Sequence, residues 1–120
     1  MNGYKTTLTL LERILLKEGY SVQAYSNPMS AFEKLKYDDF NLIISDIEMP
    51  SLNGKEFINQ VKNDEILSTI PIIIISTLET KKMKEEFKDL CIDSYIHKPD
   101  FNKNNFLVTV KNILTKNIEN

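Results

Sequence analysis

Hydrophobic residues recur along the chain in two patterns, a helical spacing and the short apolar runs of buried strands. Near the amino terminus, apolar residues three and four positions apart predict a helix over residues 5–18, and Gly19 stands where a helix often ends. Asn27 and Pro28 form an N-cap followed by proline at the first helical position, which predicts a second helix through Lys36. Further helices are expected over residues 54–62, 80–89 and 104–117.

Between these helices lie short segments rich in β-branched and aromatic residues. We expect strands at residues 20–25, 40–45, 70–75 and 92–97. The last three are too apolar for a strand with one solvated face, and they suit strands covered on both faces, as parallel strands are. The alternation of strands and helices predicts an α/β fold, a three-layer parallel sheet with helices on both faces.

Size and composition fit a single domain over residues 1–120, with a net charge of −2 and no basic footprint for nucleic acid. The longest apolar run, Ile72 to Ile75, is too short to span a bilayer, and no signal peptide is visible. The single Cys91 suits a reducing cytosol, so we expect a cytoplasmic protein in which this thiol is buried and inert.

Polar side chains follow each of the three apolar strands. Asp46 follows the first, Ser76 and Thr77 the second, and Lys98 with Pro99 the third. In parallel sheets the carboxyl ends of the strands meet at one edge, where ligands bind. An Asp carboxylate can attack phosphorus to give an acyl phosphate, a serine can donate to a phosphoryl oxygen, and a lysine can neutralise one. A divalent cation would normally bridge carboxylate and phosphate.

Four stretches resemble response-regulator receiver domains of the CheY-like, two-component signalling type. "LIISDIEMPSLNG" is similar to their phosphoacceptor segment, and "PIIIIST" to their fourth strand with its switch hydroxyl. "SYIHKP" is similar to their fifth strand, and "KEGYSVQAYSNPMSAFEKLK" to the region from the first to the second helix. The resemblance covers about Leu8 to Leu114 and implies a flavodoxin/CheY-like fold with strand order 2-1-3-4-5.

The resemblance also implies roles for individual residues. Asp46 would take a phosphoryl group from a histidine kinase or phosphotransfer protein, and Ser76 and Lys98 would bind that group. Tyr95 would change rotamer as Ser76 moves, and the Lys98–Pro99 bond would be cis. Glu48 would offer its backbone carbonyl to Mg²⁺ beside Asp46. Partners would be that kinase and a downstream protein target or effector domain, with no direct nucleic acid or membrane contact.

The chain departs from the family at its start. Receiver domains begin with a strand that ends in an acidic pair, which should fall at Asn2 and Gly3 here. The resemblance therefore implies weakened Mg²⁺ binding and a gap between the second and third strands. We expect that the native chain extends upstream of Met1. The alternatives are direct pairing of residues 20–25 with residues 40–45, or a partner chain in the gap, and a homodimer is open.

Other interpretations of these residues remain. Asp46 could be a turn residue, Ser76 and Thr77 could cap the next helix, Lys98 could be a surface lysine, and His97 is an ordinary strand residue. The expected function is a phosphorelay phosphoacceptor, with a non-phosphorylated pseudo-receiver as the alternative. A flavodoxin-like small-molecule binder lacks its Gly-rich loop. We expect no enzyme acting in trans, at most self-phosphorylation and self-dephosphorylation.

Overall fold

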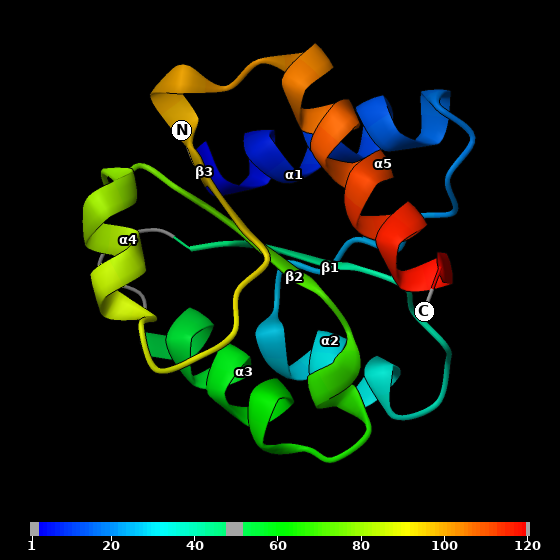
Figure 1. Cartoon of the computed structure of the whole chain (residues 1–120), viewed down its shortest axis with the longest axis vertical. Coiled ribbons are helices and arrows are strands. Elements are labelled where there is room, and N and C mark those ends of the chain that lie inside the picture. The colour runs from blue at the N-terminus through cyan, green and yellow to red at the C-terminus, as the bar shows by residue number, and fades with distance from the viewer. Residues whose placement is uncertain (1–2, 48–51, 120) are drawn as a thin grey trace.

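The computed structural model describes residues 3–47 and 52–119. Its centre is a parallel sheet with the order β1-β2-β3, formed by β1 (Ile43–Asp46), β2 (Ile72–Ser76) and β3 (Ser94–His97). Figure 1 shows this sheet between two layers of helices, so the predicted three-layer α/β architecture is confirmed.

One helical layer consists of α1 (Gly3–Lys17) and α5 (Lys103–Glu119), and the other of α2 (Pro28–Leu35), α3 (Leu52–Asn63) and α4 (Thr80–Glu86). Two short 3₁₀ turns, η1 (Leu67–Thr69) and η2 (Lys98–Asp100), precede β2 and follow β3. The predicted helices and the three apolar strands are therefore confirmed, with ends shifted by a few residues. None of the described helices is both long and apolar enough to cross a membrane.

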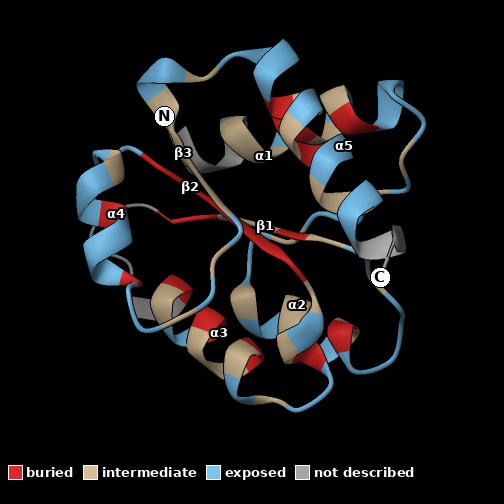
Figure 2. Ribbon diagram, in the orientation of Figure 1, coloured by how far each residue is buried: buried red, intermediate tan, exposed pale blue. Residues whose placement is uncertain are grey.

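β2 divides the core between the two layers because its alternate side chains point to opposite faces. Ile73 and Ile75 pack against α1 and α5, whereas Ile72 and Ile74 pack against the opposite helices. All are buried, and Figure 2 shows β2 in red through the centre of the molecule. Burial on both faces is the reason for the continuous apolar run "PIIII".

The first helix ends where the sequence indicates. Gly19 has φ 96°, the left-handed region that glycine enters without steric cost. The amide of Gly19 donates to the carbonyl of Leu16 (3.0 Å) and that of Tyr20 to the carbonyl of Leu15 (3.1 Å). These two bonds form a Schellman motif that satisfies the last carbonyls of α1. At the start of α2, Asn27 Oδ1 accepts a bond from the Met29 amide at 2.8 Å, as predicted.

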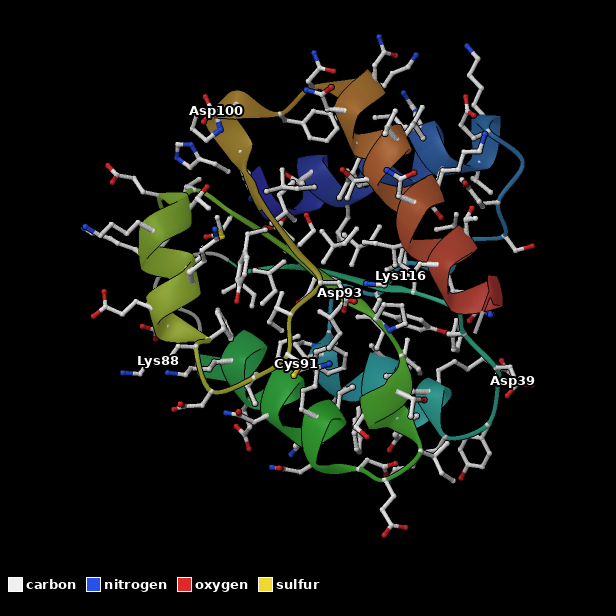
Figure 3. The ribbon with its side chains drawn as sticks, in the orientation of Figure 1. Asp39, Lys88, Cys91, Asp93, Asp100 and Lys116 are labelled. Carbon is white, nitrogen blue, oxygen red and sulfur yellow. The ribbon has the colours of Figure 1, made fainter. Side chains whose placement is uncertain are left out.

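The predicted strand at residues 20–25 is wrong. This segment is extended but lies outside the sheet, and β1 is the edge strand nearest to it. A strand needs a hydrogen-bonded neighbour, and a groove separates the segment from β1. Direct pairing of residues 20–25 with residues 40–45 is therefore also wrong. Cys91 is a further correction, because it is exposed in the loop after α4 (Figure 3) and is not a buried thiol.

Candidate functional site

Asp46 is the last residue of β1, and the sheet fixes its position. It lies in register with Ile75 of β2, and the next amide, that of Ile47, donates to the Ile75 carbonyl at 2.8 Å. The Asp46 side chain is fully buried, with 0% of its surface exposed. Burial of an ionised carboxylate is unfavourable unless a cation or hydrogen-bond donors compensate it. A buried carboxylate at a strand end is therefore more than an ordinary turn residue.

Lys98 supplies that compensation. Its Nζ lies 2.8 Å from Asp46 Oδ1, and its side chain is only 15% exposed, so it is not a surface lysine. Lys98 follows β3 directly and begins η2, where the Phe101 amide donates to the Lys98 carbonyl at 3.0 Å. The two charges come from positions 52 residues apart in sequence (98 − 46) and meet at the carboxyl edge of the sheet.

The same turn carries a second polar contact. His97 Nδ1 lies 2.8 Å from Asp100 Oδ2, with the aspartate side chain 82% exposed. Figure 3 labels Asp100 at the outer end of this turn. The contact joins the last residue of β3 to the last residue of η2, so His97 helps to fix the turn that begins with Lys98. The interpretation of His97 as an ordinary strand residue agrees with this geometry.

Ser76 ends β2 and is completely buried. It follows Ile75, the partner of Asp46, and lies in register with His97, the residue before Lys98. Its Oγ accepts a hydrogen bond from the Leu78 amide at 3.1 Å, which tightens the loop that leads into α4. Ser76 does not cap α4, whose N-cap is Glu79, and Thr77 is exposed. Because a hydroxyl donates as well as accepts, Ser76 could still donate to another group.

Tyr95 lies in register with Ile74 in the middle of β3 and is half-buried. Its ring packs against the core cluster that includes Met83 and Phe87 of the α4 region. Burial raises the pKa of the Tyr95 hydroxyl above its ordinary value, because desolvation disfavours the phenolate. The ring therefore links β3 to α4, and its predicted switch role stays a prediction.

The structure thus brings Asp46 and Lys98 into contact and places Ser76 at the same sheet edge. Glu48 and Asn2 lie outside the described residues, and Gly3 begins α1 rather than ending a strand. Sequence reasoning missed the bond between Ser76 and Leu78 and the contact between His97 and Asp100. Both contacts join residues close in sequence: Ser76 lies two positions before Leu78, and Asp100 lies three positions after His97. These short spacings could have indicated the two contacts.

Comparison with known proteins identifies the class. The family model "Response regulator receiver domain" matches residues 4–111, and the chain belongs to this family of phosphoacceptor signalling domains. The chain is 30% identical over 108 residues to the "Probable transcriptional regulator ycf29" of Pyropia yezoensis, covering 90% of this chain and 48% of that protein. It is 34% identical over 100 residues to histidine kinase P4 of Formosa agariphila, covering 83% of this chain and 7% of the kinase.

Solved structures agree with the fold. The receiver domain of a signal transduction histidine kinase from Syntrophus aciditrophicus superposes with a TM-score of 0.80 at 28% identity, covering 92% of this chain and 83% of that one. Chemotaxis protein CheY4 of Vibrio cholerae superposes with a TM-score of 0.79 at 27% identity, covering 90% of this chain and 89% of that one. This chain spans about half the length, or less, of the first curated relatives that it matches.

The family implies a magnesium ion, and one structural relative contains it. The receiver domain of a sensor histidine kinase from Pseudomonas aeruginosa, at TM-score 0.79 and 19% identity, has magnesium coordinated in its active-site cleft; the alignment covers 92% of this chain and 90% of that one. In residues 3–47 and 52–119 of this chain, no group of three or more acidic, His or Cys side chains could hold a metal. The Asp46 carboxylate contacts the Lys98 ammonium instead. The described residues alone therefore do not make up a complete magnesium site, and the expected ligand Glu48 lies outside them.

Proposed function

We propose that Asp46 is the phosphoacceptor of this receiver domain and takes its phosphoryl group from a histidine kinase or phosphotransfer protein. The observation that supports this assignment is the 2.8 Å contact between Asp46 and Lys98 at the carboxyl edge of the sheet. A carboxylate in this place could act as the nucleophile, and the cation beside it could neutralise an incoming phosphoryl group.

In the proposed transfer, an Asp46 oxygen attacks the phosphorus of a phosphohistidine. A P–O bond forms as the P–N bond breaks, and the nitrogen keeps the bonding electron pair and leaves on the imidazole. The product is an acyl phosphate on Asp46 that carries more negative charge than the carboxylate. Lys98 then contacts a phosphoryl oxygen as it contacted Asp46 Oδ1 before transfer. Hydrolysis by water would return the carboxylate and inorganic phosphate.

The proposed switch begins at Ser76. The Ser76 Oγ would move toward the phosphoryl group in order to donate to it, and this movement, rather than the donation itself, would lengthen its bond from the Leu78 amide. Leu78 packs against the same core cluster as Tyr95, so the loop before α4 and the ring on β3 move together. The surface of α4, β3 and α5 would then change its affinity for a downstream protein target or effector domain, and a homodimer is one such assembly.

Magnesium would bind this chain weakly, because the described residues hold no group of three or more His, Cys, Asp or Glu side chains for a metal and Lys98 contacts Asp46. The same shortage would make self-phosphorylation by small donors and self-dephosphorylation slow. Lys98 supplies a neutralising charge beside Asp46. Increasing Mg²⁺ should therefore accelerate phosphoryl transfer only at high concentration.

Beryllofluoride, which mimics an acyl phosphate, tests the assignment. Added with excess Mg²⁺, it should shift the amide resonances of Leu78 and Tyr95. The Leu78 amide donates to Ser76, and Tyr95 packs against the same core cluster as Leu78. Asp46→Asn should abolish the shifts, while Asp89→Asn, an exposed change after α4, should leave them intact. An unchanged spectrum, or the same shifts in Asp46→Asn, would contradict the proposal and favour the pseudo-receiver.

A further inference from the structure

The η2 turn has Lys98 at its start and a side-chain contact across its whole length. Nδ1 of His97, the last residue of β3, lies 2.8 Å from Oδ2 of Asp100, the last residue of η2. The phosphoryl transfer proposed above uses Lys98 but neither of these two side chains. We propose, on the basis of that function, that Asp100 acts through His97 as a positioning residue. The contact holds η2 where the Lys98 ammonium reaches Asp46.

Lys98 reaches Asp46 across the end of the sheet. β2 lies between β1 and β3, so the ends of β1 and β3 are two strand spacings, roughly 10 Å, apart. The Lys98 Nζ lies 2.8 Å from Asp46 Oδ1, on a side chain that is only 15% exposed. A flexible lysine stem keeps such a contact only where its backbone is held, and a misplacement of about 1 Å can slow a reaction about 100-fold. The backbone of η2 therefore sets the geometry of the site.

The hydrogen bond within η2 is a weak constraint on this backbone. Its three residues form a single 3₁₀ turn, in which the Phe101 amide donates to the Lys98 carbonyl at 3.0 Å. Hydrogen-bond geometry in 3₁₀ turns is poorer than in α-helices. Pro99, in the middle of the turn, has no amide hydrogen to donate. A side-chain contact across the turn is therefore a substantial part of what fixes it.

The contact between His97 and Asp100 ties the turn to the sheet. His97 lies in register with Ser76 of β2, so the ladder holds its backbone. Beyond Asp100, the Phe101 ring packs against the Phe106 ring of α5, with 5.5 Å between the ring centroids. The sheet thus anchors η2 at one end and α5 anchors it at the other, and the His97–Asp100 contact connects the last strand residue to the last residue of the turn.

The exposure of the two side chains determines the expected size of the effect. The side chain of His97 is 21% exposed and that of Asp100 is 82% exposed, at the outer end of the turn (Figure 3). Exposed pairs of this kind contribute little to stability, so loss of the contact should change a local rate or equilibrium by roughly 2- to 5-fold. Global unfolding should hardly change. An effect on Lys98 without an effect on unfolding distinguishes positioning from general destabilisation.

The chemical reactivity of Lys98 reports its position without any phosphoryl transfer. Limited labelling with acetic anhydride, followed by peptide mass spectrometry, gives the rate at each lysine, with the exposed Lys116 as internal reference. Asp100→Ala should raise the labelling rate of Lys98 roughly 2- to 5-fold, because the ammonium leaves Asp46 more often. Asp100→Asn should keep the parental rate, since its amide oxygen still accepts from His97.

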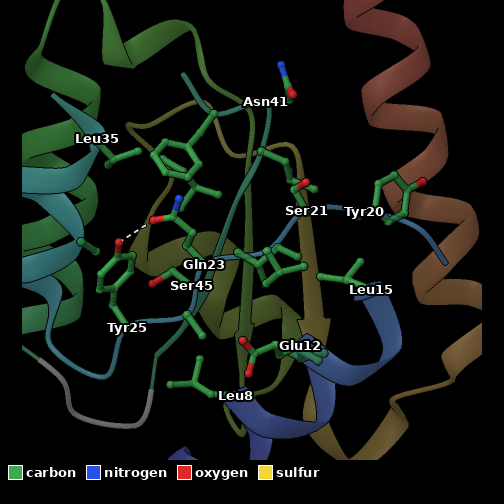
Figure 4. A pocket seen from close by; sticks show the side chains of 18 of the residues that line it. Leu8, Glu12, Leu15, Tyr20, Ser21, Gln23, Tyr25, Leu35, Asn41 and Ser45 are labelled. Atoms are coloured by element: carbon green, nitrogen blue, oxygen red, sulfur yellow. Dashed lines mark hydrogen bonds between the residues drawn. The ribbon is translucent and has the colours of Figure 1, made fainter. Parts of the chain in front are cut away.

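Two control variants remove local contacts of other segments. Asp38→Ala removes a carboxylate from an exposed ion pair with Lys34 (3.0 Å). Tyr25→Phe removes the bond from the Tyr25 hydroxyl to Gln23 Oε1 (2.6 Å), drawn as a dashed line in Figure 4. Neither contact involves η2, so both variants should label Lys98 at the parental rate.

A double-mutant cycle tests whether Asp100 acts through His97. With acetyl phosphate and excess Mg²⁺, Asp100→Ala and His97→Val should each slow phosphorylation of Asp46 roughly 2- to 5-fold. The variant with both changes should be no slower than either single variant, because the same contact is lost in all three. His97→Asn should restore most of the rate, since its amide group can donate to Asp100 in place of Nδ1. Urea unfolding should give the same midpoint for all these variants.

An unchanged labelling rate of Lys98 in Asp100→Ala would overturn the positioning role, whether or not Asp46 accepts a phosphoryl group. A double variant slowed by the product of the two single effects would also overturn it, because Asp100 would then act independently of His97. A parent protein that is never phosphorylated on Asp46 would contradict the proposed function, and the labelling of Lys98 would still decide whether Asp100 holds η2. The two failures are therefore distinguishable.

Discussion

Removal of the Lys98 ammonium should be far more destabilising than removal of the Asp46 charge. In Lys98→Met the carboxylate remains, and its side chain is 0% exposed, whereas in Asp46→Asn the ammonium remains on a side chain that is 15% exposed. A long lysine stem can turn its charge toward water, but a fully buried carboxylate at a strand end cannot. The asymmetry in exposure therefore predicts an asymmetry in stability.

The size of the effect follows from the 2.8 Å separation. With an effective dielectric constant of about 20, the attraction is 332/(20 × 2.8), or about 6 kcal/mol, and desolvation offsets part of it. We expect Lys98→Met to lower the free energy of unfolding by about 3–5 kcal/mol and Asp46→Asn by about 1 kcal/mol or less. In a domain of this size, the first change corresponds to a fall in Tm of roughly 10–20 °C.

Urea unfolding followed by far-UV circular dichroism measures both losses, with the exposed Lys88→Met as the matched control. The double variant Asp46→Asn/Lys98→Met should be more stable than Lys98→Met alone, because no buried charge is left without its partner. Equal losses in the two single variants, or a double variant whose loss is the sum of both, would show that the difference in exposure does not decide the stability of this pair.

Three further changes test other parts of the structure. Ser76→Ala should cost about 1 kcal/mol and speed hydrogen exchange at the Leu78 amide, which loses its acceptor; exchange at the Ile70 amide, bonded to the Leu67 carbonyl, serves as control. Gly19→Ala should lower the free energy of unfolding in urea by about 1–2 kcal/mol, because residue 19 has φ 96°, which alanine adopts only with backbone strain. No atom lies within 4 Å of the new Cβ, so this strain is the expected cause, and a loss near zero would contradict it. The free energy of unfolding should fall at alkaline pH in the parent protein, and Tyr95→Phe should remove the part of this fall that Tyr95 causes. Burial raises the pKa of Tyr95 in the folded state, so its contribution is complete below pH ~10 and is lost as pH rises through the folded pKa. Unfolding of both proteins at neutral and alkaline pH measures the difference, and identical pH profiles would exclude this cause.

Much of the fold could be predicted from periodicity because the strongest signals are local. The isoleucine run of β2 and the helical spacing of α5 each specify an element without reference to the rest of the chain. The order of polar residues at the strand ends also placed Asp46 and Lys98 together, because parallel strands align their carboxyl ends.

The wrong and missed predictions concern properties that depend on other parts of the folded chain. Residues 20–25 have strand-forming composition, but a strand exists only when another backbone pairs with it, and β1 lies across a groove. Cys91 has an apolar character that favours burial, yet the loop between α4 and β3 leaves it at the surface. The Ser76–Leu78 bond likewise depends on the loop conformation, which residue type alone does not determine.

Phosphoryl transfer to the protein tests the assignment of Asp46 as the phosphoacceptor. The protein should be incubated with a phosphorylated histidine kinase or, as a small donor, with acetyl phosphate and excess Mg²⁺, and the intact mass and peptide masses measured. One phosphoryl group should be added, located on the peptide that contains Asp46, absent from Asp46→Asn and retained in Asp39→Asn. A phosphoryl group on another residue, or equal modification of Asp46→Asn, would contradict this assignment.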